Sequence, residues 1–112
     1  KIDLPDVKSS TILECKVNGV KMDKLHYKSI LVYIFKCMGR EKFLSDKKFR
    51  FADKDMKGKD GFHWNKDLQL SIQNKDANNT LKEMVRLSKK NKYSLEMKIK
   101  LKNKLVKNIA FL

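Results

Sequence analysis

Lysine is the residue type that offers this chain most of its chemistry. The 112 residues include 27 Lys and Arg against 13 Asp and Glu, a formal charge of +14, and only three of the cations are arginine. Lysine meets a phosphate as a compact point charge, whereas bidentate reading of guanine favours arginine. The composition therefore predicts contact with the backbone of a polyanion rather than reading of its sequence.

The clearest pattern of cations lies in the last third of the chain. Lys98, Lys100 and Lys102 alternate with apolar residues. On a strand this spacing places the three ammonium groups on one face about 6.6 Å apart, comparable with successive backbone phosphates. A helix predicted just before this strand carries a second group on its polar side: Lys82, Arg86, Lys89 and Lys90. We expect the two elements to form one cationic surface; the alternative is an ordinary solvated face in a lysine-rich proteome.

Aromatic residues beside cations could add stacking contacts. Phe62, His63 and Trp64 close a charged segment that predicts a loop. Aromatic rings stack on nucleic-acid bases, and loops that carry aromatic and cationic side chains are typical of contact surfaces. We expect these three residues to lie near the lysine-rich strand. The alternative for His63 is a structural histidine that packs on the core.

Three residues near the N-terminus have the types used by magnesium-dependent nucleases. Asp6 follows Pro5, and Glu14 and Lys16 flank a cysteine, in the order PD…ExK. In such a site two carboxylates hold the metal and the lysine assists the attacking water. The eight positions from Asp6 to Glu14 are a short connection for neighbouring strands. An N-terminal arm followed by an ordinary strand explains the same residues, so we expect no catalytic site.

No other pattern predicts a metal or a cofactor. His26 and His63 are the only histidines and lie 37 positions apart, without a Cys or Asp cluster at ligand spacing. The aspartates of residues 53–60 suggest a calcium loop, but Trp64 stands where the bidentate glutamate should be. No glycine-rich phosphate loop occurs. We expect neither metal nor cofactor.

The elements that position these residues begin with a predicted hairpin. Residues 11–17 alternate, with Ile12 on the face of Glu14, as in a strand. Asn18 and Gly19 then predict a tight turn into a short returning strand at 20–22.

A central helix and a long loop follow. Residues 25–38 are apolar on nearly every side and predict a helix capped by Gly39, although their β-branched run also permits a strand. Residues 45–65 predict a loop, with a short strand near Phe49 and Phe51.

The remaining chain predicts two strands around a second helix and a final strand. Residues 67–73 alternate as in a half-buried strand, and Thr80 with Glu83 forms a capping box for a helix ending near Asn91. Residues 93–101 give the clearest strand signal, and 105–112 predict the last strand. The expected fold is α+β, a single small domain with two helices packed on one antiparallel or mixed sheet.

The cysteines and the termini bear on the setting of the protein. Cys15 and Cys37 lie in apolar stretches, which predicts buried reduced thiols and a cytoplasmic location; a disulfide between them is left open. No apolar run reaches the ~20 residues of a transmembrane helix, so we expect no membrane partner. The sequence starts at Lys1 without Met, and we expect a fragment of a longer protein whose other domains are possible partners.

Residues 68–93 resemble a small accessory domain found at the C-terminal end of bacterial restriction and DNA-modification-associated proteins. The similarity lies in the Leu70-Ser71 strand end, the Ala77-Asn78 pair before a helix and the strand that Tyr93 starts. This resemblance implies a domain that binds or targets DNA while a separate domain does the chemistry.

Three hypotheses follow for function. The first is a non-catalytic nucleic-acid-binding module, with DNA as the expected partner and RNA left open. The second is a protein-interaction or inhibitor module whose partner has an acidic surface. The third is the small metal-dependent nuclease that would use Asp6, Glu14 and Lys16.

Overall fold

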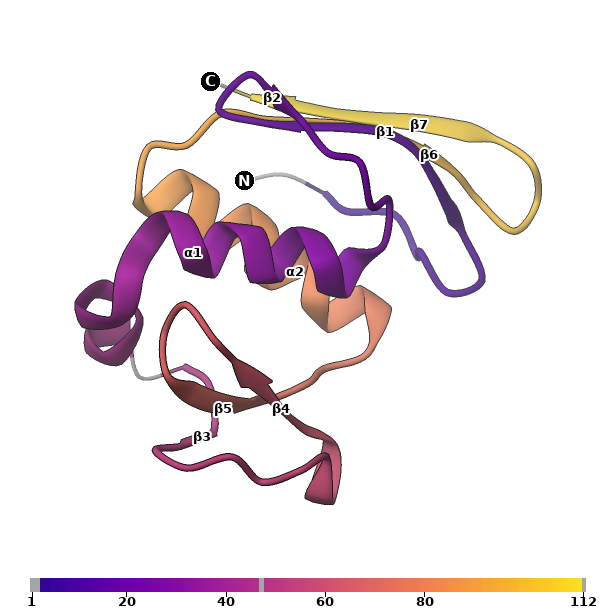
Figure 1. Cartoon of the computed structure of the whole chain (residues 1–112). Coiled ribbons are helices and arrows are strands. Elements are labelled where there is room, and N and C mark those ends of the chain that lie inside the picture. Colours follow the sequence, from indigo (N-terminus) through magenta and orange to yellow (C-terminus); the bar gives the residue numbers. More distant parts are fainter. Residues whose placement is uncertain (1–2, 47, 112) are drawn as a thin grey trace.

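The computed structural model describes residues 3–46 and 48–111 and arranges them in three layers, with two helices between two antiparallel sheets (Figure 1). The helices are α1 (Tyr27–Asp46) and α2 (Ala77–Lys90). The first sheet has the order β2 (Val20–Lys21), β1 (Thr11–Val17), β6 (Leu95–Lys100) and β7 (Val106–Phe111). The second has the order β3 (Phe51–Ala52), β5 (Leu70–Gln73) and β4 (Phe62–Asn65), and a 3-10 turn, η1 (Lys59–Gly61), precedes β4.

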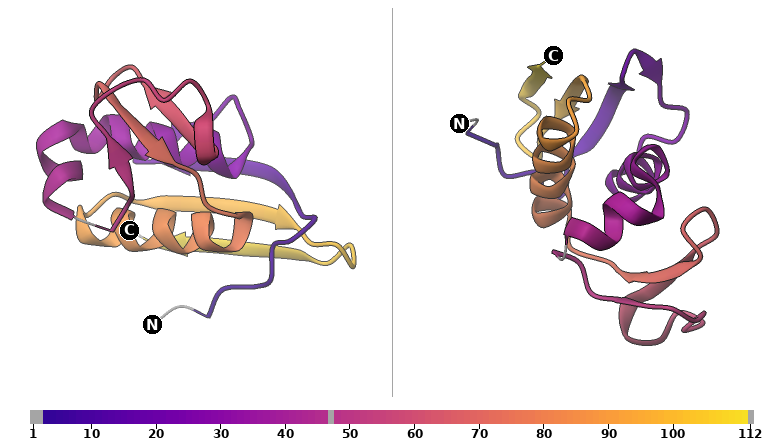
Figure 2. Two further views of the ribbon diagram at one scale, coloured as in Figure 1. Left: turned by 90° about the horizontal axis from the view of Figure 1, so that it is seen from below. Right: turned by 90° about the vertical axis from the view of Figure 1, so that its left-hand side faces the viewer.

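The α+β class with two packed helices is confirmed, but the strands divide between two sheets where one was expected. The helices are consequently covered on two sides, by the first sheet and by the second (Figures 1 and 2). This position explains why Ile30, Ile34 and Phe35 are buried, whereas Val32 and Cys37 of the same apolar stretch are exposed.

Strand β6 follows its sequence pattern, whereas β1 does not. In β6 the side chains of Leu95, Met97 and Ile99 are buried and the residues between them are exposed. In β1 a bulge shifts the register between Ile12 and Glu14. Ile12 is therefore buried while Glu14 is exposed, and the prediction that both share a face is wrong because the extra residue reverses the alternation.

Helix α1 extends beyond its predicted end. Gly39 has φ 80° and interrupts the helical geometry as expected of a cap, but a second arm continues to Asp46. An aromatic cluster holds this arm: the Phe43 ring lies 5.0 Å from Phe35 and 5.6 Å from Phe49, between centroids. Such tertiary contacts stabilise a helical turn that local sequence signals would end.

Helix α2 starts earlier than its predicted capping box. The N-cap is Asp76, whose side chain accepts a hydrogen bond from the Asn79 amide at 2.8 Å. Thr80, the predicted cap, is buried inside the helix, and its hydroxyl donates to the Lys75 carbonyl at 3.1 Å. The C-cap at Asn91 agrees with the predicted end. Within the described parts of the chain, neither helix has the length and apolar character needed to cross a membrane.

The second sheet lies where the sequence predicted mainly a loop. Strand β3 corresponds to the expected short strand, but β4 was missed, and it pairs with β5 from Phe62 opposite Gln73 to Asn65 opposite Leu70. Ser71 was expected on an exposed face of β5 and is fully buried instead. Its hydroxyl donates to the Lys54 carbonyl at 2.7 Å and accepts from the Met56 amide at 3.1 Å, which ties the charged loop to the sheet.

The two cysteines differ in environment. Both are free thiols; Cys15 is buried as predicted, but Cys37 is exposed, because it lies on the outer side of α1. Burial raises the pKa of the Cys15 thiol to about 12. The final strand is β7, which ends at Phe111; predicted position 112 lies outside the described residues.

Candidate nucleic-acid interface

The predicted strand lysines lie on the face of the first sheet that points away from the helices. Lys98 and Lys100 are exposed on β6, and Lys102 is exposed in the turn that follows. The helices pack on the opposite face, beside Met97 and Ile99, so the lysine-bearing face has no covering layer among the described residues (Figure 2). Alternation along one strand thus brings Lys98 and Lys100 together as expected.

The hairpin formed by β6 and β7 carries more cations than were predicted. Between Met97 and Phe111 it has five lysines and no carboxylate, with Lys104 and Lys107 in addition to the three expected. The hairpin turn projects beyond the ends of the helices (Figures 1 and 2). A long hairpin can project in this way because its turn is fixed by its own hydrogen bonds, from the Lys104 amide to the Leu101 carbonyl and from the Leu101 amide to the Leu105 carbonyl, both 2.8 Å.

The charge of this hairpin is almost unpaired. Among the described residues, Lys98 is the one hairpin lysine with a carboxylate within 4 Å, at 3.4 Å from Glu14 on β1. Both side chains are largely exposed, and exposed pairs contribute only about 0–1 kcal/mol. Two apolar side chains that sequence reasoning did not select, Leu105 and Val106, lie at the end of the hairpin and are 56% and 48% exposed.

The predicted cations of α2 do not join this face. Since α2 packs on the other face of the sheet, its polar side is separate from Lys98 and Lys100, and the expectation of one shared surface is wrong (Figure 2). Lys82 and Lys89 are exposed, and the Lys89 ammonium lies 5.3 Å from the centre of the Phe111 ring.

Two of the α2 cations are neutralised within the protein. Arg86 is half-buried rather than exposed and donates to both oxygens of Asp46, and Lys90 donates to the same carboxylate at 2.8 Å. The hydrogen bonds from Arg86, reinforced by Lys90, lower the pKa of Asp46 to about 2, and the same bonds together with Glu83 raise the pKa of Arg86. Arg86 and Lys90 therefore hold α2 against the end of α1 through Asp46.

The aromatic residues lie far from the hairpin. Phe62, His63 and Trp64 are in β4, in the second sheet, and the helix layer separates them from the first sheet (Figure 1). Phe62 is buried, Trp64 is 37% exposed, and His63 is exposed and bonded to Lys28. The prediction that they lie near the lysine-rich strand is wrong, because strand order could not be derived from local patterns.

Asp6 and Glu14 have different partners on different elements. Asp6 accepts a hydrogen bond from Asn78 Nδ2 in the first turn of α2, at 2.9 Å, which lowers the pKa of its carboxyl. Glu14 lies beside Lys98, and Lys16 is exposed on the same strand as Glu14. Across residues 3–46 and 48–111 the structure has no group of three or more His, Cys, Asp and Glu arranged to hold a metal ion.

Comparison of the chain with protein-family models, curated proteins and solved structures returned no match. The resemblance to a restriction-associated accessory domain therefore stays a prediction.

Proposed function

We propose that this protein binds the phosphate backbone of nucleic acid, with duplex DNA as the expected ligand, through the β6–β7 hairpin. The observation that carries the proposal is the group of five lysines on a projecting hairpin that has no carboxylate between Met97 and Phe111. Each lysine that neutralises a phosphate releases a condensed counterion, and this release drives association. The binding module needs no catalytic residue.

The shape of the hairpin suits a groove of the duplex. Strand β1 pairs with β6 as far as Lys100, so the part of the hairpin that is free on both sides is its tip, residues 101–105. Such a tip could enter the major groove, where its side chains would reach base edges and phosphates. Lys100, Lys102 and Lys107 would contact the phosphates, while Leu105 and Val106 would contact thymine methyl groups or sugars. Because none of the hairpin cations is arginine, we expect weak discrimination between sequences.

An acidic protein is a second candidate partner. The exposed Leu105 and Val106 stand among lysines, and an apolar patch with a cationic rim is also typical of a protein interface. Such a partner would bind the same hairpin. The two candidates are distinguished by whether the protein binds nucleic acid.

The test compares two lysine-to-glutamine variants of equal charge. The hairpin variant changes Lys100, Lys102, Lys104 and Lys107; the control variant changes four lysines in or beside the second sheet: Lys54, Lys57, Lys59 and Lys66. Fluorescence anisotropy with labelled duplex DNA, single-stranded DNA and RNA is measured at several salt concentrations, and thermal unfolding confirms that both variants fold.

We expect the duplex affinity of the hairpin variant to fall at least about tenfold, and its salt slope to decrease by about 0.9 for each phosphate that is no longer neutralised. The control variant should keep most of its affinity and of its salt slope. Equal decreases in the two variants would mean that the net charge, not the hairpin, drives binding. Absence of binding to all three nucleic acids at low salt would overturn the proposal and favour the acidic protein partner.

A further inference from the structure

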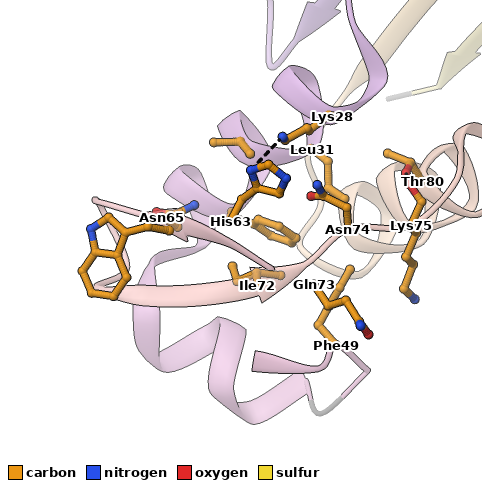
Figure 3. Close-up of a pocket in the computed structure, with 13 residues that line it drawn as sticks. Lys28, Leu31, Phe49, His63, Asn65, Ile72, Gln73, Asn74, Lys75 and Thr80 are labelled. Atoms are coloured by element: carbon orange, nitrogen blue, oxygen red, sulfur yellow. Dashed lines mark hydrogen bonds between the residues drawn. The ribbon is translucent and has the colours of Figure 1, made fainter. Parts of the chain in front are cut away.

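A cavity of about 140 Å³ lies between the first arm of α1, the β4–β5 hairpin and the start of α2 (Figure 3). Leu31, Phe35 and Ile72 contribute to its apolar wall. A cavity of about 150 Å³ lined by apolar side chains can take up one benzene ring. The space therefore fits a single six-membered ring.

The polar side of the cavity is formed by donors and cations. Lys28 Nζ lies 3.1 Å from His63 Nδ1 (Figure 3). An ammonium group can only donate, so Nδ1 accepts in this pair and Nε2 is the ring nitrogen left to donate. Lys75 also lines the cavity, with its ammonium 4.6 Å from the centre of the Phe49 ring.

One lining residue carries a buried donor without a partner. Asn65 is 6% exposed, and its Oδ1 accepts a hydrogen bond from the Leu68 amide at 2.9 Å. Its Nδ2 is buried and has no hydrogen-bond partner in the described parts of the chain. Leaving such a donor unsatisfied costs about 1–3 kcal/mol, so buried amides usually have acceptors. A ligand that pairs with Nδ2 must therefore supply an acceptor.

The electrostatics of the lining favour a negative ligand. None of the lining residues is Asp or Glu, while Lys28, Lys75 and His63 all contribute donors. Glu83 pairs with Lys75 at 3.3 Å but is outside the lining, so Lys28 is the cation there without a carboxylate partner among the described residues. Lys28, His63 and Asn74 are exposed, which leaves the cavity open to a ligand from solvent.

From these observations we infer that the cavity binds a small aromatic carboxylate with one ring. The ring would lie against Leu31, Phe35 and Ile72, and the carboxylate would pair with Lys28. Asn65 Nδ2, which neighbouring atoms cover in this structure, would turn toward the ligand as the second donor. This inference does not rest on nucleic-acid binding, because no residue that lines the cavity belongs to the β6–β7 hairpin.

The experiment uses benzoate as the probe, with benzyl alcohol as a neutral ring and acetate as a carboxylate without a ring. Binding is followed by two-dimensional amide NMR and by thermal unfolding of the whole chain. We expect benzoate to shift the amide signals of His63, Asn65 and Ile72 in a saturable way and to raise the melting temperature. Benzyl alcohol and acetate should bind at least about tenfold more weakly, since each lacks one half of the recognition.

Two variants and a control assign the contacts. Asn65→Asp keeps the acceptor for the Leu68 amide but removes the donor, and Lys28→Met removes the cation from an exposed position; each should weaken benzoate binding at least about tenfold. Lys36→Met, on the same helix but outside the lining, should leave binding unchanged. If Asn65→Asp fails to fold, Lys28→Met still tests the inference. The inference would be overturned if the amide shifts did not saturate with benzoate, or if Lys28→Met bound benzoate as tightly as the parent protein does.

Discussion

Arg86 donates hydrogen bonds from Nη1 and Nη2 to the two carboxylate oxygens of Asp46, at 2.9 and 2.7 Å, across 40 positions of sequence. This fork joins the middle of α2 to the last residue of α1. The Asp46 side chain is only 1% exposed, so the pair is shielded from solvent on the acidic side. Arg86, which was predicted to bind an external phosphate, thus stabilises the contact between the two helices.

Replacing Asp46 by Asn should lower stability and change its dependence on pH. The folded-state pKa of about 2 lies below the ordinary 3.8, so the charged carboxylate stabilises the fold above about pH 5, and this contribution of about 2 kcal/mol is lost as the pH falls towards 2. Urea unfolding at pH 7 and at points down to pH 2 measures it. Asp67→Asn, at an exposed position, is the control. An unchanged acid dependence in Asp46→Asn would contradict the assignment.

Arg86→Met should affect stability rather than nucleic-acid binding. The variant leaves Asp46 with Lys90 as its remaining cation, and removal of one partner from a largely buried pair costs about 2–4 kcal/mol. Lys82→Met, on the exposed side of α2, should change stability by less than about 0.5 kcal/mol. Urea unfolding and duplex anisotropy on both variants separate the two effects; a large decrease in affinity in folded Arg86→Met would place Arg86 in the interface.

The sequence predicted those elements whose burial follows from the pattern of neighbouring residues, and it failed where burial depends on contacts with distant parts of the chain. Strand β6 was predicted correctly because one of its faces is buried and the other exposed, which gives the alternation of apolar and polar residues seen in its sequence. Strand β4 was missed because its burial does not alternate, with Phe62 and Asn65 buried and the two residues between them exposed. Strand β5 was predicted from its alternation, but Ser71 is buried on the side expected to meet solvent, because the charged loop covers that side.

The candidate surface could be predicted only in part for the same reason. The lysines of one strand share a face by geometry alone, but whether α2 shares that face depends on the order of the layers. The partner of Arg86 lies on α1, and no spacing within α2 indicates it. The unpaired Nδ2 of Asn65 likewise has no sequence signal, because an asparagine beside a turn is ordinary.

Ser71→Ala should loosen the charged loop. The hydroxyl satisfies the Lys54 carbonyl and the Met56 amide, and its removal should cost about 1–3 kcal/mol. Limited trypsin digestion should cut after Lys54 or Lys57 faster than in the parent protein. Ser45→Ala, whose hydroxyl is exposed, is the matched control. Equal digestion rates in Ser71→Ala and the parent would show that the loop is held by other contacts.

The two thiols should react at very different rates. Cys37 is exposed, whereas burial of Cys15 raises its pKa to about 12, so Cys15 stays protonated and unreactive from pH 7 to 9. An aromatic disulfide reagent should titrate one thiol in the native protein and two after unfolding. Cys37→Ser should abolish the fast reaction. Two fast thiols in the native protein would contradict the burial of Cys15.

Leu105→Ser combined with Val106→Thr should weaken duplex binding without changing its salt dependence. Removing this apolar surface should raise Kd by about five- to tenfold, on the order of 1 kcal/mol. The salt slope counts released counterions and should stay the same. The control is Val20→Thr, an exposed apolar residue on β2, which β1 separates from the hairpin. A changed slope would mean that the double variant displaces lysines.

The pairing of β1 with β6 sets the order in which this protein can be assembled during synthesis. Thr11 lies opposite Lys100, so β1 leaves the ribosome long before its principal partner exists. Until residues 95–100 emerge, the apolar row of Ile12, Cys15 and Val17 has only the two residues of β2 beside it. An open apolar edge of this kind invites pairing with other nascent chains. A nascent chain that ends between α2 and β6 would therefore be aggregation-prone, because the first sheet cannot close before β6 has been made.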